Sequence, residues 1–141
     1  MAEPEAKPAA RLLMVSPEFI VPDVVKSAEY YRDTLGFKVL GFFLDPPVYA
    51  MVERDSVVIH FGKVAAEHQA APNHTRRPGL GLDAYIWVSD LDALHAELKD
   101  RGARIIEGPV MRVYKCREMV IEDNCGFHLA FAQDTSAQKS G

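Results

Sequence analysis

The sequence predicts an α+β fold built from two tandem modules, each running strand, helix and three further strands. The main observation is an internal echo: residues 16–41 and residues 83–108 both contain an apolar strand that ends in a Val-x-Asp motif, then an amphipathic helix, a glycine and a second strand-like run. The motifs keep one register, because Val21 and Val88 lie 67 positions apart, as do Asp23 and Asp90. We therefore expect one structural unit to occur twice in the chain.

Length and composition limit the classes of function. A chain of 141 residues that is 48% hydrophobic can form a single domain that buries roughly 70% of its unfolded surface. Its net charge of −4 gives no electrostatic basis for binding nucleic acid. No segment has the length and apolarity of a membrane span, and the N-terminus lacks the apolar run of a signal peptide. We expect a cytoplasmic protein with no nucleic acid or membrane partner, whose Cys116 and Cys125 are free thiols.

The first strand is expected to begin at Arg11, after a disordered arm of residues 1–10 that has too few apolar side chains to pack. Alternation along the strand separates two faces, because successive side chains point to opposite sides. One face is apolar throughout and should pack against the helix. The other face is mixed and should point away from the helix. The apolar face holds Leu13, Val15, Pro17, Phe19 and Val21, and the mixed face holds Met14, Ser16, Glu18 and Ile20.

Asp23 and Asp90 should each cap a helix, because a short carboxylate can accept hydrogen bonds from the unpaired amides of the first turn. Gly36 and Gly102 lie where a helix commonly ends at positive φ, which glycine adopts at little cost. Between these signals each helix carries one apolar stripe. The stripes are Val24, Ala28, Tyr31 and Leu35 in the first helix, and Leu91, Leu94 and Leu98 in the second.

The remaining strands follow from β-branched and aromatic runs separated by turn residues. In module one (residues 11–63) they are expected at 37–43, 48–53 and 56–62. In module two (residues 81–133) a strand at 82–88 precedes the helix, and strands at 103–107, 112–120 and 127–132 follow it, with turns at 108–109 and 122–126. The last strand of each module has an apolar face; the opposite faces carry Val58, His60 and Gly62, and His128, Ala130 and Ala132.

Residues 64–80 form the linker between the modules, and residues 134–141 are expected to be a disordered tail. The linker has no sustained hydrophobic period. It is either a solvated basic loop or a lid over an anionic or aromatic ligand. Its histidine and arginine side chains are His68, His74, Arg76 and Arg77.

The two strand-helix modules, the helix end Leu35-Gly36-Phe37 and the run Glu122-Asp123-Asn124-Cys125-Gly126 before the last strand resemble the vicinal oxygen chelate superfamily over about residues 12–133. This group includes glyoxalase I, bleomycin-resistance proteins, fosfomycin-resistance enzymes and extradiol dioxygenases. The resemblance implies that each module curls into half of a cup-shaped mixed sheet with the helices outside. It does not specify one function, because this fold supports several chemistries as well as binding alone.

In the metal-dependent members the ligands come from the first and last strands of each module, which the resemblance places at Ser16, His60, Asp83 and Ala130. Only His60 and Asp83 are suitable ligands, since serine is a poor neutral ligand and alanine has no donor atom. The chain is therefore closest to the metal-free bleomycin-resistance proteins, with no cofactor expected. Alternatively, one divalent metal ion is held by His60 and Asp83 with Glu18 or His128. A third possibility is that Asp83 and His60 have a structural role only and pair with each other across the cup.

The positions left to line the cup are aromatic and apolar with a few acids, a composition that suits flat or cationic organic molecules. Six further residues lie on strands whose facing the sequence does not decide: Phe43, Tyr49, Met51, Arg112, Tyr114 and Glu118. The expected ligand-binding residues are Ser16, Glu18, Val58, His60, Asp83, Tyr85, Trp87, His128 and Ala130.

Three hypotheses follow for the function. The first is a metal-independent protein that binds a small aromatic or cationic molecule as a homodimer, in which a partner covers the apolar edges of the open cups. The second is a metal-dependent lyase, isomerase or dioxygenase that uses His60, Asp83 and Glu18 or His128. The third is a metal-free enzyme in which Glu18 or His128 moves a proton. The alanine at position 130 favours the first.

Overall fold

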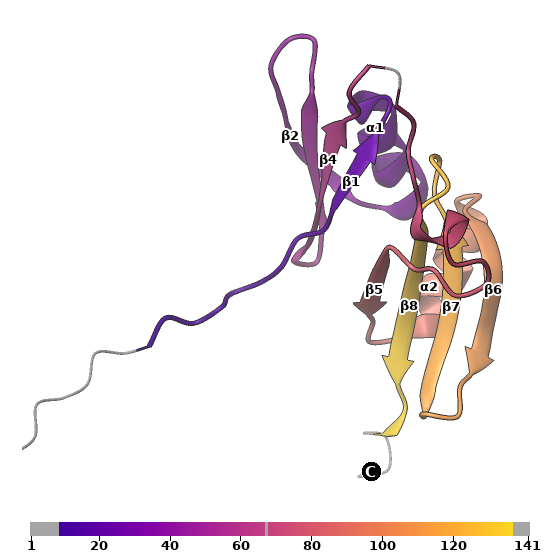
Figure 1. Cartoon of the computed structure of the whole chain (residues 1–141). Helices are drawn as coiled ribbons and strands as arrows, with labels where there is room; N and C mark the ends of the chain where they lie inside the picture. The colour runs from indigo at the N-terminus through magenta and orange to yellow at the C-terminus, as the bar shows by residue number, and fades with distance from the viewer. Residues whose placement is uncertain (1–8, 67, 137–141) are drawn as a thin grey trace, which may run out of the picture.

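A computed structural model describes residues 9–66 and 68–136 (Figure 1). In module one a strand, a helix and three strands follow one another: β1 (Glu18–Val21), α1 (Val24–Leu35), β2 (Lys38–Phe43), β3 (Tyr49–Arg54) and β4 (Val57–Lys63). The linker contains one turn of 3-10 helix, η1 (Asn73–Thr75). Module two repeats the order with β5 (Ala84–Trp87), α2 (Leu91–Asp100), β6 (Arg104–Met111), β7 (Cys116–Glu122) and β8 (His128–Asp134).

The two sheets have the same topology, which confirms the prediction of two α+β modules. Their strand orders are β1-β4-β3-β2 and β5-β8-β7-β6. In each sheet the first strand is parallel to the last strand of its module, and the other neighbours are antiparallel. The sheets are therefore mixed, and the strands that open and close each module lie side by side.

The predicted helix signals operate as expected. Asp23 Oδ1 accepts hydrogen bonds from the amides of Val25 and Lys26 at 3.0 and 3.1 Å. Asp90 accepts one from the amide of Ala93 at 3.0 Å. Helix α1 ends at Gly36, whose φ of 76° lies in the left-handed region that glycine favours. Helix α1 packs on β2, β3 and β4, and α2 packs on β6, β7 and β8.

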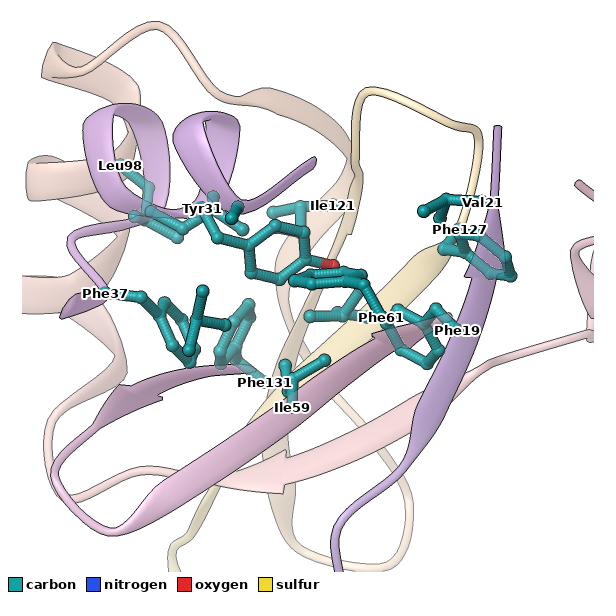
Figure 2. Packing of buried hydrophobic residues seen from close by; sticks show 14 of the residues in the cluster. Phe19, Val21, Tyr31, Phe37, Ile59, Phe61, Leu98, Ile121, Phe127 and Phe131 are labelled. Carbon is teal, nitrogen blue, oxygen red and sulfur yellow. The ribbon is translucent and has the colours of Figure 1, made fainter. Parts of the chain in front are cut away.

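One apolar core joins the modules. The rings of Phe19 in β1 and Phe127 just before β8 stack with centroids 4.6 Å apart. The fully buried Tyr31 of α1 donates a 2.7 Å hydrogen bond to Asp123 of module two. Figure 2 shows side chains of both modules, including Tyr31, Phe61 and Ile121, in a single cluster. Each sheet therefore has one face committed to the core and an opposite face available for other contacts.

The predicted strand over residues 11–17 is wrong. Strand β1 begins only at Glu18, and the last ladder bond before it runs from the amide of His60 to the carbonyl of Pro17. The alternation that predicted a longer strand is present, but residues 9–16 leave the body of the molecule as an extended segment (Figure 1) and have no strand beside them among the described residues. Residues 1–8 of the predicted disordered arm lie outside the described part of the chain, as do residues 137–141 of the predicted tail.

The predicted turn at residues 108–109 is also wrong. Strand β6 continues through Gly108 and Pro109 to Met111 with register shifts that absorb the irregular residues. The chain turns at residues 112–115 instead, and β7 begins at Cys116 rather than Arg112. Gly108 and Pro109 interrupt the ladder as a bulge, which keeps the direction of the strand, whereas a turn would reverse it.

Among the described residues, no helix has the length and apolarity needed to cross a membrane.

Candidate functional site

The core-distal face of module two carries a set of aromatic side chains. Tyr85 and Trp87 alternate along β5 with the half-buried Ala84 and Ile86, so they point away from the core. They are 40% and 59% exposed, and their rings meet edge to face with centroids 5.3 Å apart. Their partner residues on β8 are Ala130 and Ala132, both fully buried. Small side chains on β8 thus leave room for the large rings of β5.

Glu118 of β7 is the polar centre of this face. Its carboxylate accepts hydrogen bonds from Tyr85 Oη, from Tyr114 Oη at 2.5 Å and from Arg112 Nε at 3.1 Å. Burial opposes ionisation, but these three hydrogen bonds hold the pKa of Glu118 below its usual range. The pKa of Tyr85 is raised by burial and by the carboxylate beside it. Glu118 is therefore an ionised and internally neutralised group that orients two aromatic rings.

A groove runs beside these rings, where module two meets the N-terminal segment of module one. It is open to solvent and has a volume of about 450 Å³. Its walls come from the extended N-terminal segment, the start of β4 and strand β5, and most of them are apolar. We call it the β5 groove; it is lined by Met14, Val15, Pro17, Ser56, Val57, Val58, Ile59, Asp83, Ala84, Tyr85, Ile86 and Trp87.

The core-distal face of module one presents a different set of groups. Glu18 of β1 lies opposite His60 of β4 in the parallel register. His60 Nδ1 is 2.8 Å from Tyr49 Oη on β3, and the pKa of Tyr49 is raised by burial and by the charge of Glu18. The Glu18 carboxylate lies over Gly62, where an added Cβ would come within 2.6 Å of its Oε1. A side chain at this position would have to displace the end of Glu18.

Asp83 has a structural environment. Its Oδ1 accepts the amide of Asn73 at 3.0 Å, and its Oδ2 accepts the amide of His128 at 2.9 Å. Neither bond involves His60, whose ring bonds Tyr49 instead. Asp83 therefore ties the linker turn η1 to the start of β8.

The four positions that correspond to the metal ligands of the superfamily do not fit a metal ion. Ala130 supplies no donor atom and is fully buried. Both oxygens of Asp83 already accept backbone amides. His60 and a neutral Ser16 are too few ligands for a transition metal, which usually takes three or four strong donors. The alternative set is not brought together either: His128 belongs to another cluster, and although Glu18 lies opposite His60, no group of three donors that includes them is found among the described residues.

His128 stacks on His74 of the linker. Their ring centroids are 3.9 Å apart and the ring planes differ by 6°. His128 Nε2 lies 3.4 Å from Glu122 Oε1, and His74 Nε2 lies 2.9 Å from the carbonyl oxygen of Gly126. The linker is therefore fastened to the β7-β8 end of module two, while its basic residues Arg76 and Arg77 remain exposed.

The structure thus divides the residues expected to bind a ligand. Val58, Asp83, Tyr85 and Trp87 share the β5 groove, and Ser16 lies between two of its lining residues. Glu18 and His60 lie on the face of module one, His128 belongs to the histidine cluster, and Ala130 is covered. For four polar residues the sequence did not decide which side of the sheet they face. The structure places Tyr49 beside His60. It places Arg112 and Tyr114 around the carboxylate of Glu118.

Comparison with known proteins now gives the class. The model of the Glyoxalase/Bleomycin resistance protein/Dioxygenase superfamily matches residues 12–131, and the chain belongs to this superfamily. None of the curated proteins matches the sequence significantly.

Solved structures show the same fold at low sequence identity. The bleomycin-binding protein of bleomycin-producing Streptomyces verticillus, complexed with copper(II)-bleomycin, is 24% identical with a TM-score of 0.62, over 87% of this chain and 97% of that one. TnmS3, an antibiotic binding protein from Streptomyces sp. CB03234, is 22% identical with a TM-score of 0.65, over 89% and 98%. A glyoxalase-related enzyme from Clostridium phytofermentans is 17% identical with a TM-score of 0.71, over 91% and 99%.

Proposed function

We propose that this chain binds a small aromatic or cationic molecule, and that the binding does not require a metal ion at the family positions. The observation that carries the proposal is the β5 groove, in which Tyr85 and Trp87 present exposed ring surface beside a cavity of about 450 Å³. Cavities of this size are typical of small-molecule sites. Exposed aromatic faces favour stacking with flat rings and attract cations.

The charge distribution supports a role for Glu18 in recognising a cation. Glu118 is already balanced by Arg112 and by two phenol groups. Glu18 is different, because no described side chain forms an ion pair or hydrogen bond with its carboxylate. A positive group on a ligand that reaches the face of module one would find its counter-charge at Glu18.

The similar structures include binding proteins as well as a glyoxalase-related enzyme. Two of them are a bleomycin-binding protein and an antibiotic binding protein. Binding is favoured here because only His60 and Asp83 of the four positions assigned to metal ligands are suitable donors, and both oxygens of Asp83 already accept backbone amides. We infer the same general activity here, the reversible binding of an organic molecule.

The homodimer belongs to this proposal. Leu12, Leu13 and Val15 in the N-terminal segment are 102%, 83% and 87% exposed. Apolar side chains gathered in this way mark a surface that another protein covers. The same segment lines the β5 groove through Met14, Val15 and Pro17, so a second copy that covers the segment would also close the groove.

The dimer is tested by deleting residues 1–15. We expect the full chain to sediment as a dimer and the shortened chain as a monomer that keeps its circular dichroism spectrum, since the deletion ends before β1. A full chain that remains monomeric at high concentration contradicts this part of the proposal.

Ligand binding is tested by titrating the protein with planar aromatic amines, quinones and aromatic antibiotics in the presence of EDTA. Trp87 is the single tryptophan of the chain, so an occupied groove should change its fluorescence, and calorimetry should measure the affinity independently. We expect Trp87→Ala to weaken binding by about two- to tenfold, because one lost aromatic contact accounts for about 0.5–1.5 kcal/mol. The matched control is Phe42→Ala, which removes an aromatic ring that is 46% exposed on β2. If no member of the panel binds, or if both variants weaken binding equally, the proposal is wrong.

A further inference from the structure

We propose that His74, Glu122 and His128 form a binding site for a divalent late transition-metal ion, apart from the positions that the superfamily uses. The site lies where the linker turn η1 meets the end of β7 and the start of β8. It is the one group of three or more histidine, cysteine or acidic residues with suitable spacing among the residues that the structure describes. The proposal is independent of the organic ligand proposed above.

The spacing of the donor atoms supports a metal site. One donor atom from each of the three residues lies within 4.8 Å of the other two. His128 Nε2 is 3.4 Å from Glu122 Oε1, and His74 Nε2 is 3.9 Å from the same oxygen. Two ligands of a tetrahedral ion with bonds of about 2.0–2.1 Å are separated by about 3.3 Å. Of the three donor pairs, His128–Glu122 already has the separation that a shared ion requires, His74–Glu122 exceeds it by about 0.6 Å, and the two histidine donors lie within 4.8 Å of each other.

The three side chains are sheltered and held by neighbours. Their exposed fractions are 28% for His74, 17% for Glu122 and 16% for His128. Arg104 Nε lies 3.1 Å from Glu122 Oε2, which leaves Oε1 directed at the histidines. Neighbours that orient a ligand in this way are a regular part of metal sites and raise their affinity.

Asp83 positions both histidines. It accepts the amide of His128 with one oxygen and the amide of Asn73, the residue before His74, with the other. A single carboxylate therefore fixes the linker against β8. The two imidazoles are 54 positions apart in sequence, yet their backbones are held together without any ion.

One movement is required for an ion to bind. In the structure the imidazole rings are parallel, so their lone pairs run side by side and do not converge. The ring of His74 must rotate out of the stack, and its Nε2 donates a hydrogen bond to the carbonyl of Gly126. Coordination through His74 Nε2, the atom that lies 3.9 Å from Glu122 Oε1, replaces this hydrogen bond with a bond to the ion.

The donor set selects the class of ion. Two imidazoles and one carboxylate suit Zn²⁺, Ni²⁺, Co²⁺ and Cu²⁺, with water completing the coordination. Mg²⁺ and Ca²⁺ prefer oxygen ligands throughout, so they should not compete at this site.

The test is a calorimetric titration of tag-free protein with ZnCl₂, after removal of bound metal with EDTA and exchange into chelator-free buffer. We expect saturation at one Zn²⁺ per chain and no response to MgCl₂. His74→Ala and His128→Asn should each lower the affinity for Zn²⁺ at least about tenfold, the lower end of what disturbing a metal's surroundings costs. His74 lies in the linker, so its variant keeps the test valid if His128→Asn fails to fold. His68→Ala, in the same linker but exposed, is the matched control and should bind Zn²⁺ like the unaltered chain.

A second measurement identifies the residues directly. Ni²⁺ is paramagnetic and broadens the NMR signals of nearby protons, so substoichiometric NiCl₂ should erase the ring signals of His74 and His128 first. The ring signals of His60 and His95 should persist.

Three outcomes overturn the proposal: no saturable binding of Zn²⁺, binding that survives both histidine variants, or binding that His60→Ala removes. The last would instead place the ion at the family positions. Because the organic ligands are titrated in EDTA, failure of the metal site leaves that result unchanged, and failure of ligand binding leaves the Zn²⁺ titration unchanged.

Discussion

The buried polar side chains of this protein form groups whose members hydrogen-bond to one another or to nearby backbone amides. Asp123 shows this most clearly: one oxygen accepts the amides of Cys125 and Phe127 at 2.9 Å each, and the other accepts Tyr31 Oη at 2.7 Å. No side-chain nitrogen or oxygen that is buried in the described part of the chain lacks a hydrogen-bond partner. An unpaired buried polar group is costly. Removing one partner of such a set should therefore lower the free energy of unfolding by more than the net contribution of a single hydrogen bond.

Tyr31→Phe tests this directly. The substitution leaves the ring packing intact but removes the hydroxyl that donates to Asp123, so we expect the free energy of unfolding to fall by about 1–3 kcal/mol. Urea denaturation measures the change. Tyr30→Phe is the control, because Tyr30 Oη makes only a long 3.5 Å contact with the carbonyl of Glu122. Equal losses in the two variants would refute the role assigned to the Tyr31-Asp123 bond.

Asp123 also predicts a dependence of stability on pH. Burial raises the pKa of its carboxyl above the ordinary value of 3.8 despite its hydrogen bonds. Between these two pKa values the folded state binds more protons than the unfolded state, so this residue's contribution to stability falls as the pH rises. Asp123→Asn cannot titrate. We therefore expect the variant to gain stability relative to the unaltered chain between about pH 4 and the raised pKa, and to stay level above it.

Urea denaturation of both proteins at a series of pH values measures this difference. A difference that stays constant through the range, or that changes in the opposite direction, would show that the pKa of Asp123 is not raised.

At the scale of elements, strand β6 is the departure that most affects the candidate site. Its bulge at Gly108 and Pro109 moves the chain reversal to residues 112–115. Arg112 and Tyr114 come from that reversal, and both bond Glu118. The polar centre of module two thus depends on a strand that continues beyond its proline.

Gly108→Ala should disrupt this arrangement. Gly108 has a φ of 88°, and an added Cβ would overlap the carbonyl oxygen of Glu118. The left-handed conformation alone costs about 1–2 kcal/mol for a residue with a side chain, and the overlap adds to it. Thermal denaturation should show a clear loss for Gly108→Ala and little change for Gly41→Ala, a strand glycine with no atom within 4 Å of the added Cβ. Comparable melting temperatures for the two variants would contradict the steric argument.

At the scale of the whole molecule, the modules share one core and should unfold together. Besides the stacked rings of Phe19 and Phe127, Arg54 of module one forms an ion pair at 2.7 Å with Glu97 of α2. Contacts of this kind couple the halves, because either half alone would expose part of the cluster to water.

Phe127→Ala should therefore destabilise both modules. Phe127 is 5% exposed, and removing such a ring from a core typically costs about 3–5 kcal/mol. Hydrogen exchange should show faster exchange of core amides in β4 as well as in β8. Phe43→Ala, which removes a ring that is 63% exposed, should change stability by no more than about 0.5 kcal/mol. Loss of protection in module two alone would mean that the halves fold separately.

Local patterns in the sequence predicted the features that local physics decides. Helix caps, apolar stripes and strand faces depend on neighbours within a few residues, and the repeat supplied the order of elements. The stacking of His74 on His128 was not predicted, because it joins distant residues through a linker without a period. The strand over residues 11–17 was predicted wrongly, since alternation shows that a segment can pair but not that a partner strand lies beside it.

Trp87 has a further consequence for how this protein can be studied. With 59% of its surface exposed, its indole is already largely hydrated in the folded single chain, so unfolding should hardly alter its emission wavelength. Intrinsic fluorescence will therefore be a poor indicator of denaturation and a good indicator of whatever covers the groove. A shift of the emission to shorter wavelength on concentrating the protein, with no ligand added, would be the optical signature of two chains coming together.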